Sequence, residues 1–346
     1  MRHIAVLACL LALACLAPFA ATAAPDDPPA TPGIDSNWAA AEIRTVVARG
    51  ALASSVDAFR PDDPVTRGEL HEALTLLGLP TAPPADPDRI VVLSELDAKL
   101  VAALSLSDAA RWIRVAVRDA DLGPTSHVGI ESVARLLGLR VNHPQGEEYL
   151  ELAPAEPATR AEAAYSLARA LLVTPARKAE LRKLAATLQI PQLTGGQRSV
   201  LARALRFVGY PYVWAGSSEL VQQLYYGMAP GGFDCSGFVW RVYKLQPFTD
   251  APLLGATIRG RTTFSMSAEM RKADRIALAA LQPGDLAFFG ARGTASTPQE
   301  VGHMGIVVAP GWFVHSSGNG VTLQPLLGWY LSHFAWGRRP LREAGL

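Results

Sequence analysis

Cys235 is the one cysteine outside the N-terminal leader, and the residues around it suit a nucleophile. It lies within residues 231–240, whose sequence is Gly-Gly-Phe-Asp-Cys-Ser-Gly-Phe-Val-Trp, and the other two cysteines, Cys9 and Cys15, lie in an apolar leader. Glycines followed by an amphipathic run predict a loop that leads into a helix with Cys235 at its N-terminus. The helix dipole and free N–H groups there favour a thiolate. A lone cysteine with distant histidines is typical of a nucleophilic hydrolase, and the alternative is a buried, inert cysteine.

Two histidines are the natural partners of this thiol. His303 begins one apolar run and His315 ends the next, and Ala309-Pro310-Gly311 between them predicts the turn of a hairpin. Both imidazoles then lie near one end of the hairpin, within reach of a helix packed across it. That arrangement suits a thiolate–imidazolium pair with a third polar group that orients the base. Zinc is the alternative, but local Cys-x-x-Cys or His-x-x-x-His spacing is absent, so we expect neither a metal nor a cofactor.

The elements that position these residues change in character along residues 197–346. An amphipathic helix is expected over 197–208 and a second one over about 235–245. Short runs rich in β-branched and aromatic residues, separated by Pro-Gly and Gly-Asn-Gly turns, then predict about five strands. They are Asp285–Phe289, His303–Val308, Trp312–His315, Val321–Gln324 and Phe334–Arg338. Helices followed by a meander of strands predict an α+β domain.

Five ordered sequence blocks in this region resemble the NlpC-type cell-wall peptidases, a papain-like group of bacterial cysteine hydrolases. The blocks are Pro211–Gly216, Phe233–Val239, Leu281–Phe289, Gly302–Ile306 and Phe313–Ser316. The resemblance implies a papain-like fold and cleavage of peptidoglycan stem peptides, usually between γ-D-glutamate and a diamino acid.

Matched position by position, the resemblance implies a role for six residues. Cys235 is the nucleophile, His303 the base and His315 the orienting third residue. The backbone N–H of Cys235 would donate to the oxyanion. Three further positions match residues beside the nucleophile or at the amine end of the substrate: Tyr212, Asp234 and Ser236. Each has a structural alternative, as a core aromatic for Tyr212 and as helix caps for the other two.

Residues Ser217–Pro230 depart from the short form of the family. This apolar insertion precedes the nucleophile, where the common loop has only a few residues. We consider three roles for it: a helical lid, a wall of the substrate groove, or a contact with the N-terminal region. Because of this departure, the resemblance does not define which end of the substrate the site prefers, whereas the catalytic assignment is unaffected.

Residues 37–190 have a helical pattern with a repeated start signal. Thr66 with Glu69, and Thr159 with Glu162, are Thr-Arg-x-Glu capping boxes, each preceded by a Pro-containing loop. Asn37 can cap a helix that begins at Trp38, and residues 93–117 and 128–139 supply further amphipathic helices. We interpret the region as a degenerate array of stacked helical units.

Two parts of this region resemble an S-layer homology module: residues 38–69, and residues 150–171 as its second half, whereas the middle third matches poorly. The resemblance implies retention on the bacterial envelope by a cell-wall polysaccharide. Trp38, Arg67 and Arg160 are candidates to contact such a glycan. The alternative is that the boxes and loops only specify helical packing.

The N-terminus and the composition indicate the compartment. Arg2 and His3 precede an apolar run that ends at small residues, which predicts a signal peptide over residues 1–24. A retained anchor or a lipoprotein signal at Cys15 is the alternative, and no other run is long enough to span a membrane. A net charge of +1 in 346 residues gives no support for nucleic-acid binding.

The expected organisation is therefore an exported, cell-envelope protein with five successive parts. They are a signal peptide (1–24), a lead-in (25–36), a helical S-layer-homology-like domain (37–190), a linker (191–196) and an NlpC-type catalytic domain (197–346).

Overall fold

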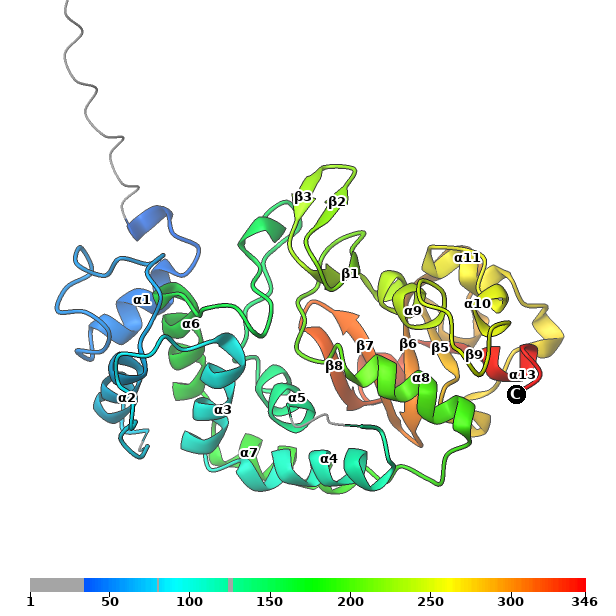
Figure 1. The fold of residues 1–346 in the computed structure, drawn as a ribbon, viewed down its shortest axis with the longest axis horizontal. Coiled ribbons are helices and arrows are strands. Elements are labelled where there is room, and N and C mark those ends of the chain that lie inside the picture. Colours follow the sequence, from blue (N-terminus) through cyan, green and yellow to red (C-terminus); the bar gives the residue numbers. More distant parts are fainter. Residues whose placement is uncertain (1–33, 80, 124–126) are drawn as a thin grey trace, which may run out of the picture.

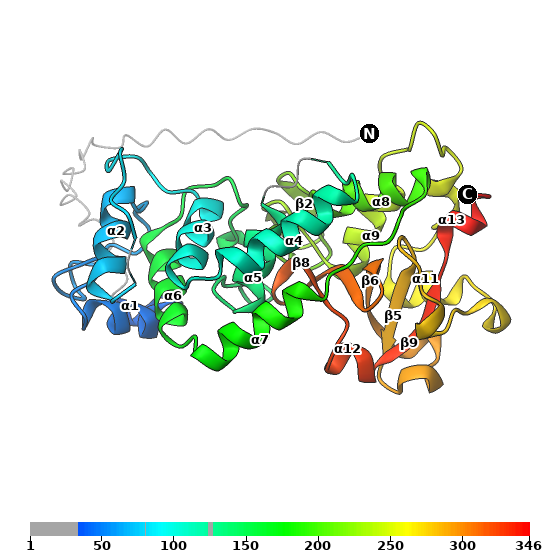
Figure 2. The same cartoon turned by 90° about the horizontal axis from the view of Figure 1, so that it is seen from below.

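The computed structural model describes residues 34–79, 81–123 and 127–346, and the expected signal peptide and most of the lead-in lie outside them. The described chain is elongated, with helices in its N-terminal half and a sheet with covering helices in its C-terminal half (Figures 1 and 2). The helices are α1 (Ala40–Val47), α2 (Arg67–Leu76), α3 (Leu93–Ala103), α4 (Ser107–Asp119), α5 (Val128–Leu136), α6 (Arg160–Leu171), α7 (Pro175–Ala186), α8 (Gly195–Leu205), α9 (Cys235–Tyr243), α10 (Leu254–Thr257), α11 (Thr263–Ala268), α12 (Trp329–Ser332) and α13 (Pro340–Glu343). The strands are β1 (Ser217–Ser218), β2 (Gln222–Leu224), β3 (Gly227–Ala229), β4 (Gly232–Phe233), β5 (Leu286–Gly290), β6 (Val301–Ala309), β7 (Trp312–Ser317), β8 (Gly320–Pro325) and β9 (Phe334–Arg338).

Three short segments meet in a closed ring at the centre of the N-terminal region. The N–H of Val65 donates to the carbonyl of Ala158, that of Ala158 to Val91, and that of Val91 back to Val65. All three residues are fully buried. Helices α2, α3 and α6 begin directly after these three segments, and each helix together with the loop before it forms one unit. The first two N–H groups of each helix donate to carbonyls in the loop that precedes another of the three helices. Helical N-termini therefore join the units, because their N–H groups have no partner inside the helix.

This ring shows how the three units are arranged. They close on one another, and the middle unit, which matches the S-layer homology module poorly in sequence, occupies a position equivalent to the other two. Its segment has Val92 and Leu93 where the others have a Thr-Arg pair, so the sequence signal is lost although the backbone contacts are kept.

The capping boxes are formed unequally. Thr66 and Glu69 cap α2 reciprocally, as predicted. Thr159 accepts from the N–H of Glu162, but the Glu162 carboxylate lies near the ring of His143 and does not complete the box. The first helix starts at Ala40, two residues later than expected, and Asn37 accepts from the N–H of Ala39.

The C-terminal half is an antiparallel sheet in the order β8-β7-β6-β5-β9, so the predicted α+β class is confirmed. All five strands overlap the predicted runs. One face carries Phe288, Ile306 and Val314, which share a core with Phe238 of α9. The opposite face carries a smaller hydrophobic cluster, formed by Ala287, Phe289, Val307, Phe313, Leu326 and Phe334. Because α9 packs against β6 and β7, the sheet sets the position of the cysteine at its N-terminus.

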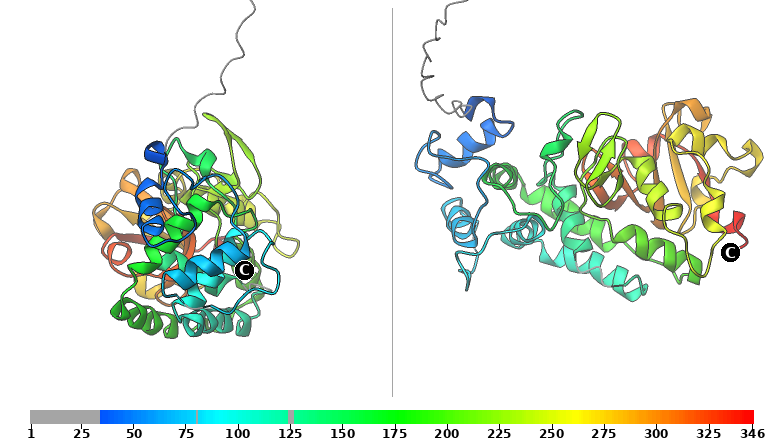
Figure 3. Two further views of the ribbon diagram at one scale, coloured as in Figure 1. Left: turned by 90° about the vertical axis from the view of Figure 1, so that its left-hand side faces the viewer. Right: turned by 45° about the horizontal axis from the view of Figure 1, so that its top comes forward.

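The two halves pack closely against each other. Helix α5 lies against the edge strand β8, and the two labelled elements are neighbours in Figures 1 and 2. The right-hand view of Figure 3 shows the helical half beside the half that contains the sheet. From α5, the buried Arg135 donates to the carbonyls of Gly209 and Asn319 in the C-terminal half. On the other side of β8, the indole of Trp312 donates to Thr187 at the end of α7. The helix expected from Gln197 begins at Gly195, because Thr194 caps it.

Candidate active site

Cys235 is the first residue of α9 and faces a pocket. Asp234 caps the helix by accepting from the N–H of Gly237 at 2.5 Å. Gly237 has no room for a side chain, since a Cβ there would lie 1.9 Å from the carbonyl oxygen of Gly216. This close approach fixes the start of α9 against the preceding loop. Cys235 is 8% exposed and is the one free cysteine among the described residues.

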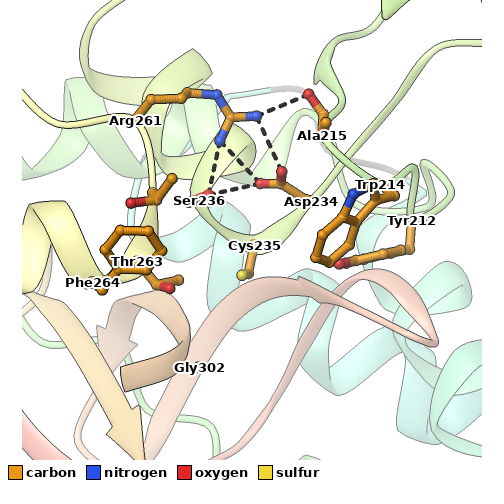
Figure 4. Close-up of a pocket in the computed structure, with 11 residues that line it drawn as sticks. Tyr212, Trp214, Ala215, Asp234, Cys235, Ser236, Arg261, Thr263, Phe264 and Gly302 are labelled. Carbon is orange, nitrogen blue, oxygen red and sulfur yellow. Dashed lines mark hydrogen bonds and ion pairs between the residues drawn. The ribbon is translucent and has the colours of Figure 1, made fainter. Parts of the chain in front are cut away.

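The pocket has a volume of about 430 Å³ and lies over the thiol. Tyr212 and Trp214 line one side of it, and Arg261 and Phe264 line another (Figure 4). Gly302, immediately before His303, also lines it. The cavity is large enough for a short stretch of extended substrate.

His303 and His315 lie together at one end of the β6–β7 hairpin. Nε2 of His303 and Nδ1 of His315 are 2.7 Å apart, so one donates a hydrogen bond to the other. The backbone pairing of β6 and β7 runs from Ala309–Trp312 to Ile306–Val314, and the two imidazoles connect the strands beyond its end. A Cβ at Gly305 would lie 2.8 Å from the Cβ of His315, so only glycine permits this approach.

Aromatic side chains enclose the two imidazoles. His315 is fully buried and stacks on Phe313 with ring centroids 4.4 Å apart. Tyr330 of α12 meets His315 edge-on at 4.9 Å. Nε2 of His315 lies in this enclosure without a hydrogen-bond partner among the described residues.

Burial dominates the ionisation of the thiol and of both rings. Burial, followed by the charge of Asp234, raises the pKa of Cys235 to about 12. The backbone N–H groups of Ser236 and Met304 act in the opposite direction. Burial also lowers the pKa of His303 to about 4, and that of His315 well below its usual value. The helix N-terminus alone therefore does not produce the thiolate that the sequence suggested, because desolvation outweighs it.

The thiol lies beside the strand that carries His303. Helix α9 packs against β6, and Gly302, the residue before His303, lines the same pocket as Cys235. Since Nε2 of His303 is bonded to His315, Nδ1 is the ring nitrogen left for a thiol. The arrangement can transfer a proton from sulfur to imidazole while the second imidazole holds the ring in place.

Tyr212, Asp234 and Ser236 all line the pocket. Burial, followed by the charge of Cys235, raises the pKa of Tyr212, so its hydroxyl is neutral. The carboxylate of Asp234 accepts from Ser236 at 2.9 Å and is paired with Arg261 at 3.1 Å. Asp234 thus caps the helix and lines the pocket, whereas Ser236 lines the pocket and donates to the capping carboxylate.

Arg261 is the pocket residue that sequence reasoning missed. It donates to Asp234, to the hydroxyl of Ser236 at 2.8 Å and to the carbonyl of Ala215 at 3.0 Å (Figure 4). It comes from the loop before α11, far from any recognised block. No local pattern marks it, because its partners are set by the tertiary fold.

The Ser217–Pro230 insertion is a β-hairpin, so the helical lid is wrong. β1 pairs with β4, and β2 pairs with β3. Gln222 anchors it by accepting from the N–H of Ser217 and donating to the carbonyl of Gly232. At its tip, Tyr226 donates to the carbonyl of Trp214 at 2.8 Å, which connects it to the pocket wall. β3 also packs against a 3₁₀ turn at Glu148–Leu150, so the insertion contacts the N-terminal region.

The glycan candidates of the N-terminal region differ in their accessibility. Arg160 is buried and pairs with Glu69 at 2.5 Å, so it is unavailable to a ligand. Arg67 pairs with Glu95 at 2.6 Å and keeps 23% of its side chain exposed. Trp38 lines a surface cavity of about 340 Å³ together with Tyr149.

The described residues contain neither a metal-binding cluster nor a candidate membrane-spanning helix. Within residues 34–79, 81–123 and 127–346, His, Cys, Asp and Glu side chains form no group of three or more that could hold a metal ion. Across the same ranges, no helix has the length and apolar character needed to cross a bilayer.

Sequence comparisons match both halves of the chain to known families. Residues 209–339 match the NlpC/P60 family, and residues 31–70 match the S-layer homology domain. A probable endopeptidase of Mycobacterium tuberculosis is 33% identical over 135 residues, covering 39% of this chain and 27% of that protein. The murein DD-endopeptidase MepH of Escherichia coli is 31% identical over 122 residues, covering 35% of this chain and 36% of that protein. The chain thus spans well under half the length of either relative.

A solved structure of an NlpC/P60 family protein from Bacillus cereus is 26% identical, with a TM-score of 0.32, and covers 44% of this chain and 42% of that chain. The two resemblances noted in the sequence are confirmed by the family matches. The chain carries an NlpC/P60 domain over residues 209–339, preceded by a helical region that begins with an S-layer homology match.

Proposed function

We propose that this protein is an exported cysteine endopeptidase that hydrolyses peptidoglycan stem peptides at the bond between γ-D-glutamate and a diamino acid. Residues 197–346 act as the catalytic domain. The observation that carries the proposal is the pocket-facing Cys235 at the start of α9, beside the strand whose His303 is bonded to His315. The endopeptidase names of the relatives support the same class of activity.

The first half of the reaction forms a thioester. His303 takes the thiol proton on Nδ1 as the sulfur of Cys235 attacks the γ-carbonyl carbon of the glutamyl residue. The resulting oxyanion accepts from the backbone N–H of Cys235, at the positive end of the helix dipole. The C–N bond then breaks, and His303 returns the proton to the leaving amine of the diamino acid.

The second half releases the enzyme. A water molecule gives its proton to His303 and attacks the thioester carbon, and the C–S bond breaks to free the glutamyl carboxylic acid and the thiolate. His303 returns the proton to sulfur. His315 accepts from Nε2–H of His303 throughout, which keeps Nδ1 directed at the sulfur.

A second function is the binding of stem peptides without hydrolysis, because the pocket lined by Tyr212 and Arg261 offers the same binding surface whether or not the thiol reacts. A third possibility keeps the thioester: an acyltransferase changes the acceptor from water to an amine, whereas an amidase keeps water and hydrolyses a different amide bond.

Digestion of purified muropeptides by the wild type and by Cys235→Ala separates these functions. New amino termini on the diamino acid, found by mass spectrometry and lost in the variant, are expected for the endopeptidase. Products that carry an added amine would identify the transferase. Unchanged muropeptides that remain bound, alongside an active reference enzyme, would instead support the binding module.

We also propose that the N-terminal region holds the enzyme at the cell envelope by binding a cell-wall polysaccharide. The S-layer homology match and the exposed cavity beside Trp38 and Tyr149 support this location. Retention of the full chain on intact sacculi, and its loss on sacculi stripped of polysaccharide, is the expected result. Equal retention on both preparations would refute anchoring through that polymer.

A further inference from the structure

The pocket wall that carries Tyr212 and Trp214 is an extended segment with two hydrogen-bonding edges. Along one edge, the carbonyl of Pro211 accepts from the N–H of Phe233, and the N–H of Val213 donates to the carbonyl of Phe233. Backbone groups alternate in direction along an extended chain, so the N–H and carbonyl of Tyr212 face the other edge. Those two groups need partners of their own.

Asn142 supplies both partners from the N-terminal region. Its Oδ1 accepts from the N–H of Tyr212 at 2.7 Å, and its Nδ2 lies 3.4 Å from the carbonyl oxygen of Tyr212. One primary amide therefore takes the place of a neighbouring strand. Asn142 precedes Tyr212 by 70 residues and lies between α5 and the 3₁₀ turn at Glu148–Leu150.

The start of the same segment is also held by the N-terminal region. The carbonyl of Gly209 accepts from the buried Arg135 of α5. Gly209 has a φ of +102°, and a Cβ there would lie 2.8 Å from the carboxylate of Glu131. The segment therefore passes in close contact with α5 before it reaches the pocket.

The far end of the wall meets the N-terminal region through the hairpin. Tyr226 of the hairpin donates to the carbonyl of Trp214, and β3 of the hairpin packs against the 3₁₀ turn at Glu148–Leu150. This turn follows Asn142 closely in the chain. Residues 131–150 thus contact the wall directly at its start and its middle, and reach its end through the hairpin.

We propose that Asn142 is a positioning residue for substrate binding, and that the helical region is part of the architecture of the peptidase pocket as well as a module beside it. The inference rests on the proposed peptidase function, because its main readout is cleavage. Removal of the amide frees the Tyr212 edge, and the wall shifts away from the position that faces the thiol.

The test compares Asn142→Leu with the wild type in the full chain, using a purified disaccharide–tetrapeptide muropeptide as substrate. Displacement of a pocket wall weakens substrate binding, so we expect KM to rise about tenfold while kcat changes by less than about twofold. A loss of folded protein would have the opposite signature, because it lowers apparent kcat and leaves KM unchanged.

Two further variants make the result specific. Asn142→Asp keeps the acceptor for the Tyr212 N–H and loses the donor, so its KM is expected between those of the wild type and Asn142→Leu. It also serves if the leucine variant fails to fold. Thr187→Val removes another hydrogen bond between the two halves, at the opposite end of the β6–β7 hairpin, and its KM should match the wild type.

Alkylation of Cys235 by iodoacetamide provides a readout that needs no substrate. A displaced wall opens the pocket, so Asn142→Leu should react several-fold faster than Thr187→Val. If the wild type cuts no muropeptide, the proposed function fails while this rate still tests the inference. Equal KM values for Asn142→Leu and Thr187→Val, or equal alkylation rates where nothing is cut, overturn it.

Discussion

The N-termini of α2 and α6 in the helical region and of α9 in the NlpC/P60 domain are built alike but face different surroundings. Each has a polar side chain that caps the helix, Thr66, Thr159 and Asp234, and each is followed by one functional group at the first helical position. In α2 and α6 that group is an arginine, Arg67 or Arg160, which pairs with a glutamate of another unit.

In α9 the first helical position is Cys235, whose side chain lines a cavity instead of forming an ion pair with another element. A capped helix N-terminus holds the side chain of its first residue in a fixed position, and the role of that side chain depends on what it faces. In α2 and α6 the arginine faces another helical unit and joins the two units by an ion pair. In α9 the thiol faces a pocket.

Of the variants that test this difference, Cys235→Ala is expected to have the largest effect. We expect peptidase activity to fall by about 10⁴-fold or more, because the group that forms the covalent intermediate is gone. The free energy of unfolding should change by no more than about 2 kcal/mol, since the substitution removes one buried sulfur atom and keeps the Cβ in place. Turnover assays and thermal melts check both parts. Residual activity within about tenfold of the wild type would remove Cys235 from the role of nucleophile.

His315→Ala tests whether the second imidazole only orients the first. We expect kcat to fall by about 10²- to 10³-fold, because His303 loses the partner of its Nε2 at 2.7 Å. His71→Ala is the matched control, since His71 lies on α2 with Thr81 as its hydrogen-bond partner. Equal turnover in the two variants would argue that His315 has no part in the reaction.

Arg160→Met tests the opposite use of the same helical position. The Arg160 side chain is 4% exposed and Glu69 is 37% exposed, so the loss should be near the lower limit for a buried pair, about 3 kcal/mol of unfolding free energy. Denaturant unfolding measures it. Specific activity of the folded fraction should stay the same. Arg67→Ala should cost less, because both members of the Arg67–Glu95 pair keep some exposure.

The smallest expected effect concerns the pH at which kcat/KM falls on the acid side. Burial lowers the pKa of His303 to about 4, so its imidazole stays neutral, and able to accept the thiol proton, down to that pH. Activity should therefore persist through pH 5 and fall as the pH drops through about 4. An acid limb between pH 6 and 7, near the ordinary pKa of histidine, would show that the base is not buried as described.

Much of the C-terminal half could be predicted from sequence because its signals are local. The turn at Ala309–Gly311 and the glycines before Cys235 specify a hairpin and a helix start from neighbouring residues alone. Arg261 and Asn142 could not be predicted in this way. Their partners lie 27 and 70 residues away, and only the tertiary fold brings them together.

Two other features escaped sequence reasoning for physical reasons. The helix dipole favours a thiolate at Cys235, but burial is a property of the folded surroundings and reverses the direction of the pKa shift. The middle helical unit keeps its backbone contacts with Val92 and Leu93 in place of threonine and arginine. A motif defined by side chains cannot detect a contact made by the main chain.

The closed ring of Val65, Val91 and Ala158 has a consequence for the order of folding. Its last member lies close to Arg160, whose pairing with Glu69 spans 91 residues of chain. The helical region therefore cannot complete its core until about residue 160 has been synthesised. Contacts of such long range form slowly, because a large loop must close first. A shorter chain lacks the third member of the ring, so the buried backbone groups of Val65 and Val91 each lose a hydrogen-bond partner.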